Sequence, residues 1–361
     1  MGIERFFSSI NEQFDIITDI KYPYTKTNTT HLFIDFNSII HVVSSNIENK
    51  LDDINNVIID RVKNYIYDLL KNNFNTNKLE FIMIAIDGVP SKAKMIEQKR
   101  RRYLGELISL ITKKNNMWNK NNISPGTLFM HLLSIELNKQ DFLMNLKKHS
   151  PNLKNLIVSD IYFFEEGEKK ITNCINKMKF NKNDIITIYS PDSDVILLSM
   201  ILKTDNQNII VYRHDQQKSK GSQYVFNKID INKLKIKITD YINLKNIKFQ
   251  NQIDDIVLIF TIFGDDFLPK IKSYDVKNDI IKIFDFYKLT LIKTNTHLIN
   301  NNKLNFEFFT AFLEILSLIE DKVLKENNIS KQYHNYNRNS LNNLNVYFSI
   351  IGTAISPTAC Q

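Results

Sequence analysis

The chain has 361 residues, of which 43% are hydrophobic and 24% are charged. This balance is typical of a globular protein and excludes a wholly disordered chain, and no apolar run reaches the ~18 residues that a membrane span needs. The net charge of +8 indicates a polyanionic partner such as nucleic acid, although a chain rich in Lys needs no function to explain its charge. Two cysteines, Cys174 and Cys360, are too few for a disulfide framework or a cysteine zinc site.

The first residues, Met1 to Phe6, lack the basic and then apolar pattern of a secretion signal. We therefore expect a cytoplasmic protein, with the nucleus as the alternative location. No membrane partner is expected.

Four short apolar runs predict buried strands, and apolar residues with helical spacing lie between them. One such helix is predicted over 54–70. Strands that alternate with helices indicate an α/β fold with a mostly parallel central sheet and helices on both faces. The predicted strands cover residues 32–34, 81–86, 185–189 and 209–212.

The pattern changes toward the C-terminus. The apolar segment 256–263 fits either a strand or a buried helix, because its period does not decide between them. Amphipathic helical patterns follow at 280–292 and 306–319, so the sheet is expected to be followed by a helical segment.

Acidic residues follow the predicted strands at the points where those strands end. Ligands of an open parallel sheet bind outside the carboxyl ends of its strands, so these carboxylates are expected to meet at one edge. They are Asp35, Asp87, Asp192, Asp194, Asp265 and Asp266, joined by Glu165, Glu166 and Glu168 after the apolar residues 161–164.

Crowded carboxylates repel one another and require either raised pKa values or a cation. A hard divalent cation with oxygen ligands would satisfy such a cluster, and two of them would suit phosphoryl chemistry. The alternative for each acidic residue is a helix cap or a turn residue.

A basic segment follows Asp87. From Lys94 onward its composition predicts a helix on which Lys94, Gln98, Arg101 and Arg102 share one face. Arg binds phosphate through a planar fork, so this face predicts a phosphate pocket beside the carboxylates. The alternatives are a solvated helix face or a nuclear localisation patch.

His41 lies six residues after Asp35, on the helix that the strand would lead into. Its imidazole could stack on a nucleic-acid base. A packed helix residue is the alternative reading for a single histidine.

Together these residues carry a resemblance to one protein family. Over roughly residues 1–320 the chain resembles the amino-terminal catalytic region of the Xrn-type 5′→3′ exoribonucleases. The matching motifs are Met1-Gly2-Ile3 with Phe6-Phe7, Asp35 through His41, Ala85 through Val89, Ala93-Lys94-Met95, Gln98 through Arg102, Ile123 through Thr127, Glu166 through Lys170, Asp192-Ser193-Asp194 and Gly264 through Pro269.

The resemblance implies a nuclease fold of the PIN and flap-nuclease type that degrades single-stranded RNA with a 5′-monophosphate to mononucleotides. It implies a phosphate pocket made by Lys94, Gln98, Arg101 and Arg102, with His41 stacking on the first bases. It also implies two Mg²⁺ ions, or Mn²⁺ as the alternative. The metal ligands would be Asp35, Asp87, Glu166, Glu168, Asp192, Asp194 and Asp266.

The chain also departs from the family pattern. Asp265 stands where the family usually has Asn, and Glu165 stands where a Gly is usual. The family's second sequence block is expected to be missing, so either the shorter form works alone, or a partner protein completes it, or its activity is impaired. A flap-type DNA nuclease of the same fold and a non-catalytic RNA-binding remnant remain as alternatives.

The resemblance also suggests how the chain is divided. We expect an Xrn-type nuclease domain over residues 1–270 and a helical extension over 271–325 that packs on it. An Asn-rich linker and tail would follow over 326–361.

Overall fold

The centre of the structure is a seven-stranded sheet with the strand order β1-β7-β6-β5-β2-β3-β4. The computed structural model describes residues 3, 5–20, 25–45, 47, 53–111, 118–203, 208–215, 219, 225–243, 249–264, 271, 273–318, 320 and 323–325. The strands are β1 (Ile17–Ile20), β2 (His31–Asp35), β3 (Phe81–Ala85), β4 (Asn155–Ser159), β5 (Ile186–Tyr189), β6 (Ile209–His214) and β7 (Phe226–Asp230).

Strands β2 to β6 pair in parallel, while β7 pairs antiparallel with both β6 and β1. The predicted α/β fold with a mostly parallel sheet is therefore confirmed. The four predicted strands correspond to β2, β3, β5 and β6. The chain runs outward from β2 to β3 and β4 and then returns to β5 on the other side of β2. The β2–β5 border is thus the topological switch point, where open α/β sheets bind their ligands.

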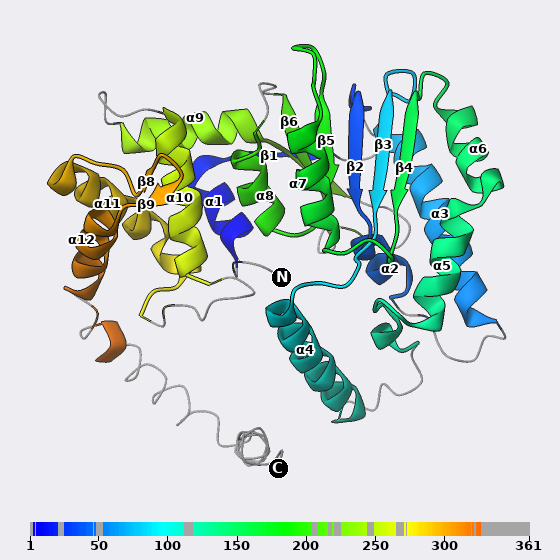
Figure 1. The fold of residues 1–361 in the computed structure, drawn as a ribbon, viewed down its shortest axis with the longest axis horizontal. Helices are drawn as coiled ribbons and strands as arrows, with labels where there is room; N and C mark the ends of the chain where they lie inside the picture. Colours follow the sequence, from blue (N-terminus) through cyan, green and yellow to red (C-terminus); the bar gives the residue numbers. More distant parts are fainter. Residues whose placement is uncertain are drawn as a thin grey trace.

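Helices cover both faces of the sheet (Figure 1). Leu32 and Ile34 of β2 point into one core, and Phe33 points into the other, because successive side chains of a strand alternate between faces. The first core is covered by α3 (Ile54–Asn73), α5 (Leu128–Asn138) and α6 (Gln140–His149). The second is covered by α1 (Phe6–Phe14), α7 (Gly167–Lys177), α8 (Asp194–Met200), α9 (Ile231–Ile242), α10 (Phe249–Ile262), α11 (Val276–Thr294) and α12 (Phe306–Ser317).

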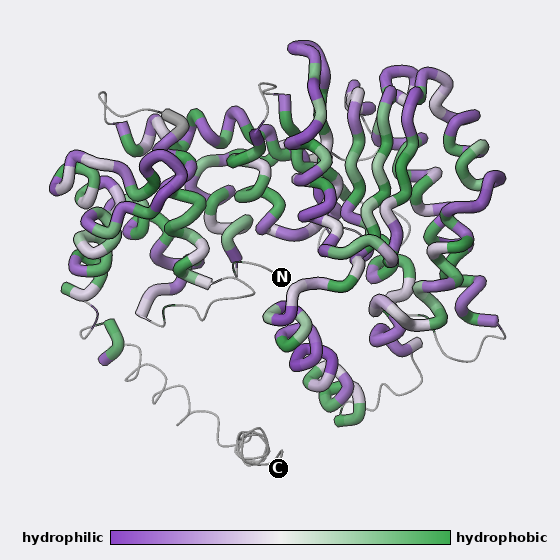
Figure 2. Tube along the Cα trace, viewed as in Figure 1, coloured by the Kyte–Doolittle hydropathy of each residue, from purple (hydrophilic) through white to green (hydrophobic). Residues whose placement is uncertain are grey.

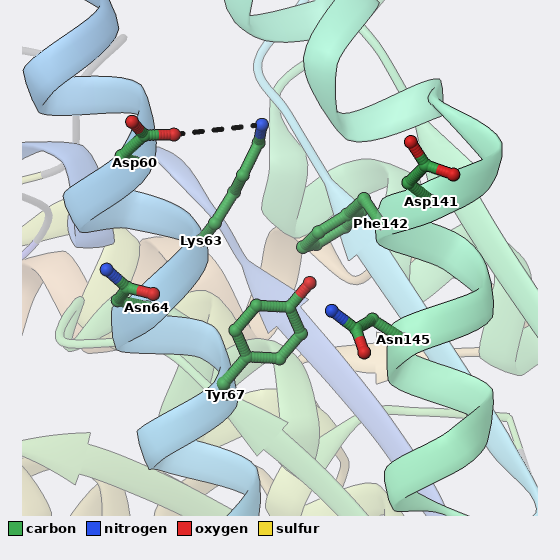
Figure 3. Close-up of a pocket in the computed structure, with 7 residues that line it drawn as sticks. All are labelled: Asp60, Lys63, Asn64, Tyr67, Asp141, Phe142 and Asn145. Atoms are coloured by element: carbon green, nitrogen blue, oxygen red, sulfur yellow. Dashed lines mark ion pairs between the residues drawn. The ribbon is translucent and has the colours of Figure 1, made fainter.

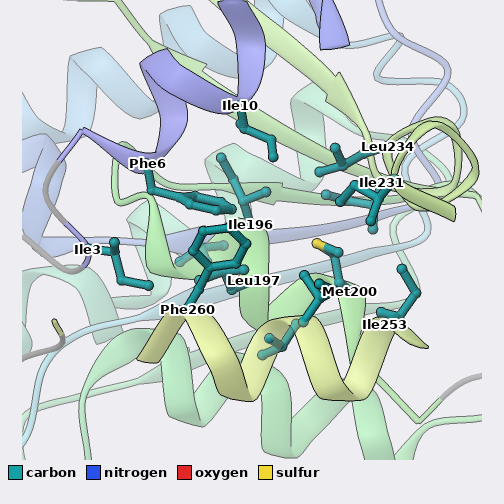
Figure 4. Packing of buried hydrophobic residues seen from close by; sticks show 14 of the residues in the cluster. Ile3, Phe6, Ile10, Ile196, Leu197, Met200, Ile231, Leu234, Ile253 and Phe260 are labelled. Carbon is teal, nitrogen blue, oxygen red and sulfur yellow. The ribbon is translucent and has the colours of Figure 1, made fainter. Parts of the chain in front are cut away.

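The ambiguous segment 256–263 belongs mainly to helix α10. Its buried residues Ile253, Ile256, Val257 and Phe260 recur at the spacing of one helix face. Figure 4 shows α10 packed against α1 and α8, and the rings of Phe6 and Phe260 meet edge to face with centroids 5.0 Å apart. The N-terminal helix is thereby part of the main core.

Helices α11 and α12 share this core. Phe284 of α11 contacts Phe14 of α1 and Phe260 of α10 edge to face, at 5.7 and 5.3 Å between ring centroids. A short hairpin, β8 (Ile299–Asn300) and β9 (Lys303–Leu304), joins the two helices. The predicted linker and tail at 326–361 lie outside the described residues. Among the helices that the structure describes, none is both long and apolar enough to cross a membrane.

Helix α4 (Lys92–Ile111) stands apart from the layers. It projects from the carboxyl edge of β2 and β3 (Figure 1), and only Lys94 of its residues is buried. Figure 2 shows hydrophilic residues along its middle, in contrast to the largely hydrophobic strands. Helix α2 (Asn37–Val43) lies at the same edge, directly after β2.

A shallow pocket lies between α3 and α6 (Figure 3). None of the acidic residues that follow the sheet strands contributes to it. Its lining residues are Asp60, Lys63, Asn64, Tyr67, Asp141, Phe142 and Asn145.

Candidate active site

Asp35 is the last residue of β2 and lies at the switch point. Its carboxylate is buried, and the hydroxyl of Ser190, just after β5, donates a hydrogen bond of 2.7 Å to Oδ2. Burial raises the pKa of Asp35 well above its usual range, and the charges of Asp87 and Asp192 raise it further. Three carboxylates from three different strand ends therefore act on one another.

Asp87 follows β3 and is held from two sides. The side-chain amide of Asn37 donates to Oδ2 at 2.9 Å, and the backbone N–H of Gly167 donates to Oδ1 at 2.7 Å. Burial raises the pKa of Asp87 to about 6, with the Gly167 N–H opposing this rise and Glu166 adding to it. Asp87 accepts from the first N–H of α7 but is not its N-cap residue, which is Glu166. That helix is distant in sequence.

Gly167 lets helix α7 approach the two carboxylates closely. A Cβ atom at this position would lie 2.8 Å from Oδ1 of Asp35 and 2.9 Å from the carbonyl oxygen of Ala85. Contacts this short do not occur for real Cβ atoms, so a larger residue would force α7 outward. The N-terminal end of α7, which favours negative charge, therefore faces Asp35 and Asp87.

Glu166 and Glu168 flank Gly167. Oε1 of Glu166 forms a buried ion pair with Nζ of Lys94 at 3.0 Å. Burial raises the pKa of Glu168 to about 7, and the nearby charges of Asp194 and Glu166 add to the rise. Lys94 opposes it, so one cation from α4 already lies within the acidic cluster.

The loop after β5 supplies Asp192 and Asp194. The backbone N–H of Asp192 donates to the hydroxyl of Ser190 at 3.1 Å, and the N–H of Ile3 donates to Oδ1 of Asp194 at 2.9 Å. The structure therefore brings six of the seven expected metal ligands to one edge of the sheet. The seventh, Asp266, lies outside the described residues, as does Asp265.

The cluster has the chemistry that a divalent cation requires. Its donors are carboxylate oxygens, which hard cations prefer. Burial first and acidic neighbours second raise the pKa values of Asp35, Asp87 and Glu168, so their ionised forms are disfavoured and a cation would supply the compensating charge. Within the described part of the chain, no three His, Cys, Asp or Glu side chains are arranged so that they could already hold one ion together. The residues fit the ion by their chemistry, and their side chains would adjust around it.

The predicted phosphate-binding residues are divided between two places. Lys94 lies in the carboxylate cluster, while Nη2 of Arg102 donates to Oε1 of Gln98 at 3.1 Å farther along α4. Nε of Arg101 lies 3.4 Å from Oε1 of Glu97. Burial lowers the pKa of Arg102, and the neighbouring charge of Arg101 lowers it further.

His41 lies on α2 with an exposed side chain. Partial burial lowers the pKa of His41, the charge of Lys120 lowers it further, and the charge of Asp192 opposes the change. The ring is therefore on the carboxylate side of the sheet and is accessible to a ligand.

Several residues at the site were not predicted from the sequence. Asn37 and Ser190 orient Asp87 and Asp35, and Lys170 donates to the carbonyl oxygens of Ile86 and Asp160 at 2.6 and 2.8 Å. The position of Ser190 directly after a predicted strand was the one available signal for that residue.

Arg213 was missed as well, although it interacts electrostatically with the site. Its guanidinium carbon lies 3.8 Å from the centre of the Phe7 ring. Burial lowers the pKa of Arg213 to about 10, and the negative charge of Asp192 opposes this change. Nothing in its sequence context distinguishes it from a solvated strand residue.

The carboxylate cluster predicts an unusual pH dependence of stability. A carboxyl whose pKa rises to about 7 on folding stabilises the fold when it is protonated, and this contribution is lost as the pH rises from about 4 through 7. The variant Glu168→Gln cannot ionise, so in excess chelator it should be more stable than the wild type by about 2–3 kcal/mol at pH 8 and nearly equal to it at pH 4. Urea unfolding at both pH values measures this difference. An equal difference at pH 4 and pH 8 would contradict the raised pKa.

Comparison with known protein families gives two matches along the chain. The family model described as "XRN 5′-3′ exonuclease N-terminus" matches residues 1–215. A second model, described as "Xrn1 helical domain", matches residues 246–349. The second match includes α10, α11 and α12.

Similar proteins carry related names. A protein of Acanthamoeba polyphaga mimivirus whose name describes a 5′-3′ exonuclease is 36% identical over 240 residues, which are 64% of this chain and 38% of the relative. A "5′-3′ exoribonuclease 2" of Kluyveromyces lactis is 28% identical, with 92% of this chain and 40% of the relative covered. The chain thus spans about two fifths of the length of these relatives. Among solved structures, the catalytic core of Rad2 in complex with DNA substrate aligns with a TM-score of 0.38 at 12% identity, covering 81% of this chain and 75% of that one.

Proposed function

Because the chain belongs to the XRN 5′-3′ exonuclease family, we propose that it hydrolyses single-stranded RNA from the 5′ end and releases mononucleotides. The observation that carries this proposal is the convergence of buried carboxylates at the β2–β5 switch point. Asp35, Asp87 and Glu168 come from three distant segments, and each has its pKa raised by burial first and by acidic neighbours in addition. Strongly perturbed carboxylates at a ligand-binding edge are typical of a catalytic site.

We further propose that the cluster works with two divalent cations, Mg²⁺ or alternatively Mn²⁺. When bound, such ions polarise the scissile phosphate and lower the pKa of an attacking water. Ser190 and Asn37 hold Asp35 and Asp87 in place, and the other carboxylates of the cluster would adjust around the ions. The ions would be held by Asp35, Asp87, Glu166, Glu168, Asp192, Asp194 and Asp266.

The basic face of α4 supports a preference for a 5′-monophosphate. Arg101 and Arg102 are adjacent cations, and the lowered pKa of Arg102 reflects in part the charge of Arg101. A phosphate dianion between the two guanidinium groups would relieve this repulsion and could accept paired hydrogen bonds from each. Lys94 and Gln98 complete the proposed pocket, and His41 is proposed to stack on a base of the bound end.

This proposal predicts the effect of removing the arginines. Arg101→Ala and Arg102→Ala should each reduce the preference for 5′-monophosphate over 5′-hydroxyl RNA about ten- to hundredfold, because a charge-assisted hydrogen bond contributes about 1.5–3 kcal/mol. Arg100→Ala is the matched control on the same helix, since the side chain of Arg100 is 70% exposed and that of Arg101 only 25%. Competition between the two RNAs in one reaction measures the preference. If all three variants behave alike, the face is only a solvated surface.

One digestion experiment tests the function itself. Matched RNAs with a 5′-hydroxyl, a 5′-monophosphate or a 5′-triphosphate, and a DNA of the same sequence, are incubated with the chain in Mg²⁺ and in excess chelator. We expect mononucleotides from the 5′-monophosphate RNA in Mg²⁺ and none in chelator. Preferred cleavage of DNA would instead support a flap-type nuclease, and RNA binding without cleavage in any metal would support a non-catalytic role.

A further inference from the structure

Three exposed aromatic side chains in succession form a loop beside the carboxylate cluster. The aromatic loop consists of Tyr162, Phe163 and Phe164. We propose that it is a stacking platform for the bases of the single strand whose phosphate lies at the carboxylates. The identity of that strand rests on the proposed function. Tyr162 is 63% exposed, Phe163 61% and Phe164 76%. Aromatic rings that are not needed in a core and gather on a surface mark an interaction site.

The backbone places this loop directly at the site. The carbonyl oxygen of Glu165 accepts a hydrogen bond from the N–H of Gly88 at 2.9 Å, and the N–H of Glu165 donates to the carbonyl oxygen of Val89 at 3.1 Å. A Cβ atom on Gly88 would lie only 1.8 Å from the carbonyl oxygen of Phe163, so the two segments are in close contact. Asp87 directly precedes Gly88, the residue that contacts the loop, and Glu166 directly follows Glu165. Two of the candidate metal ligands therefore lie next to the loop.

Hydrogen bonds hold the turn in one conformation. Oδ1 of Asp160 accepts from the N–H of Tyr162 at 3.0 Å, and the carbonyl oxygen of Asp160 accepts from the N–H of Phe163 at 3.3 Å and from Nζ of Lys170 at 2.8 Å. The hydroxyl of Tyr162 is hydrogen-bonded to Nδ1 of His131 on α5. A fixed platform loses little conformational entropy when a ligand binds, which favours affinity.

Glu165 closes the loop in an unusual backbone conformation. Its φ is +82°, a region that favours glycine, and its side chain accepts a hydrogen bond of 2.8 Å from Asn173. A non-glycine residue in this region carries strain that is typically kept where the geometry serves a site. Here the strained residue turns the chain from the exposed rings into the carboxylate cluster.

The positive charge of helix α4 favours nucleic acid as the ligand of the aromatic loop. Helix α4 begins three residues after Val89 and carries four consecutive cations, Lys99 to Arg102. Aromatic platforms beside cations are typical of single-stranded nucleic-acid binding, in which bases stack and phosphates contact the basic groups. An apolar protein partner would not need the cations of α4, the helix that follows the same segment of the chain.

Binding measured in excess chelator tests the platform without any cleavage. The variant carrying Tyr162→Ala, Phe163→Ala and Phe164→Ala should bind a labelled single-stranded oligo(A) RNA roughly tenfold or more weakly than the wild type in fluorescence anisotropy. It should bind an abasic oligonucleotide of equal length as the wild type does, because only the bases stack. Phe306→Ala is the matched control, since Phe306 is 72% exposed on α12, away from the carboxylates.

A second variant keeps the test valid if the triple variant misfolds. Phe164→Trp retains an aromatic ring, so this variant should bind oligo(A) with wild-type affinity. The fluorescence of the indole introduced at position 164 should be quenched when a base stacks on it. Trp118, which is 4% exposed, gives a constant background. Unchanged oligo(A) affinity in the triple variant, or no quenching in Phe164→Trp, would overturn the proposal. A change in self-association without a change in RNA affinity would overturn it too. The binding test needs no cleavage. If the platform variants behave as expected but the wild-type chain never cleaves RNA, only the proposed activity is refuted and the platform stands.

Discussion

Asp35→Asn is expected to reduce RNA cleavage by about a hundred- to thousandfold while the protein stays folded. The variant removes a charge at the switch point, where the proposed reaction needs negative oxygens to hold cations, and losses of this size follow the removal of single catalytic electrostatic groups. The hydroxyl of Ser190 can still donate to the amide oxygen of Asn at this position, so the local structure should survive. Mononucleotide release from 5′-monophosphate RNA measures the loss.

Stability provides the control for this variant. Burial raises the pKa of Asp35, so its ionised form destabilises the metal-free fold at neutral pH, and Asp35→Asn should unfold at an equal or higher urea concentration than the wild type in chelator. Asp60→Asn on α3, whose side chain is 71% exposed, should leave both cleavage and stability unchanged. Wild-type cleavage by Asp35→Asn would exclude the proposed role of the cluster.

Asp255→Ala is expected to lower the free energy of unfolding by about 3–5 kcal/mol without acting at the catalytic edge. Asp255 of α10 is fully buried and accepts four hydrogen bonds. Its donors are the Tyr287 hydroxyl at 2.9 Å, Nδ1 of His297 at 3.0 Å, and the backbone N–H groups of Leu298 and Ile299 at 3.1 and 2.8 Å. Removal of the carboxylate would leave these buried donors without their acceptor.

The matched control is Asp285→Ala on α11. Asp285 accepts one exposed hydrogen bond, from the Tyr241 hydroxyl at 2.7 Å, so its loss should change stability by less than about 1 kcal/mol. Urea unfolding monitored by circular dichroism gives both values. Equal effects of the two substitutions would show that the Asp255 network does not hold α10, α11 and the hairpin together.

The sequence by itself identified the central strands and the acidic residues that follow them. Strands β2, β3 and β5 are buried on both faces, so each appears as a continuous apolar run, and the residue after each run is local in sequence. Helices α3, α11 and α12 were predicted for the same reason, because the spacing of their apolar residues is a local property. The acidic residues from Asp35 to Asp194 could therefore be assigned to one edge of the sheet.

Strands β1 and β7 and the ambiguous segment 256–263 were decided only by tertiary structure. Strands β1 and β7 mix polar with apolar residues, so neither has the apolar run of a central strand. Strand β4 does have such a run, Leu156 to Val158, and it was missed although the signal is local. Segment 256–263 became a helix because α1, α8 and α11 offer it a packing surface. Such surfaces are assembled from distant parts of the chain and leave no local signal.

The same distinction holds at the site. The types and order of the carboxylates are local features, whereas the contacts that orient them join residues far apart in sequence: Ser190 with Asp35, Gly167 with Asp87, and Lys94 with Glu166. The exposure of the aromatic loop was hidden as well, since an apolar run after a strand resembles core until its surroundings are known. The sequence determined which groups are available for chemistry. The packing of α7 and α4 against the strand ends decided how those groups meet. Only tertiary structure could decide this, because close approach in space is what changes the ionisation and hydrogen bonding of these groups.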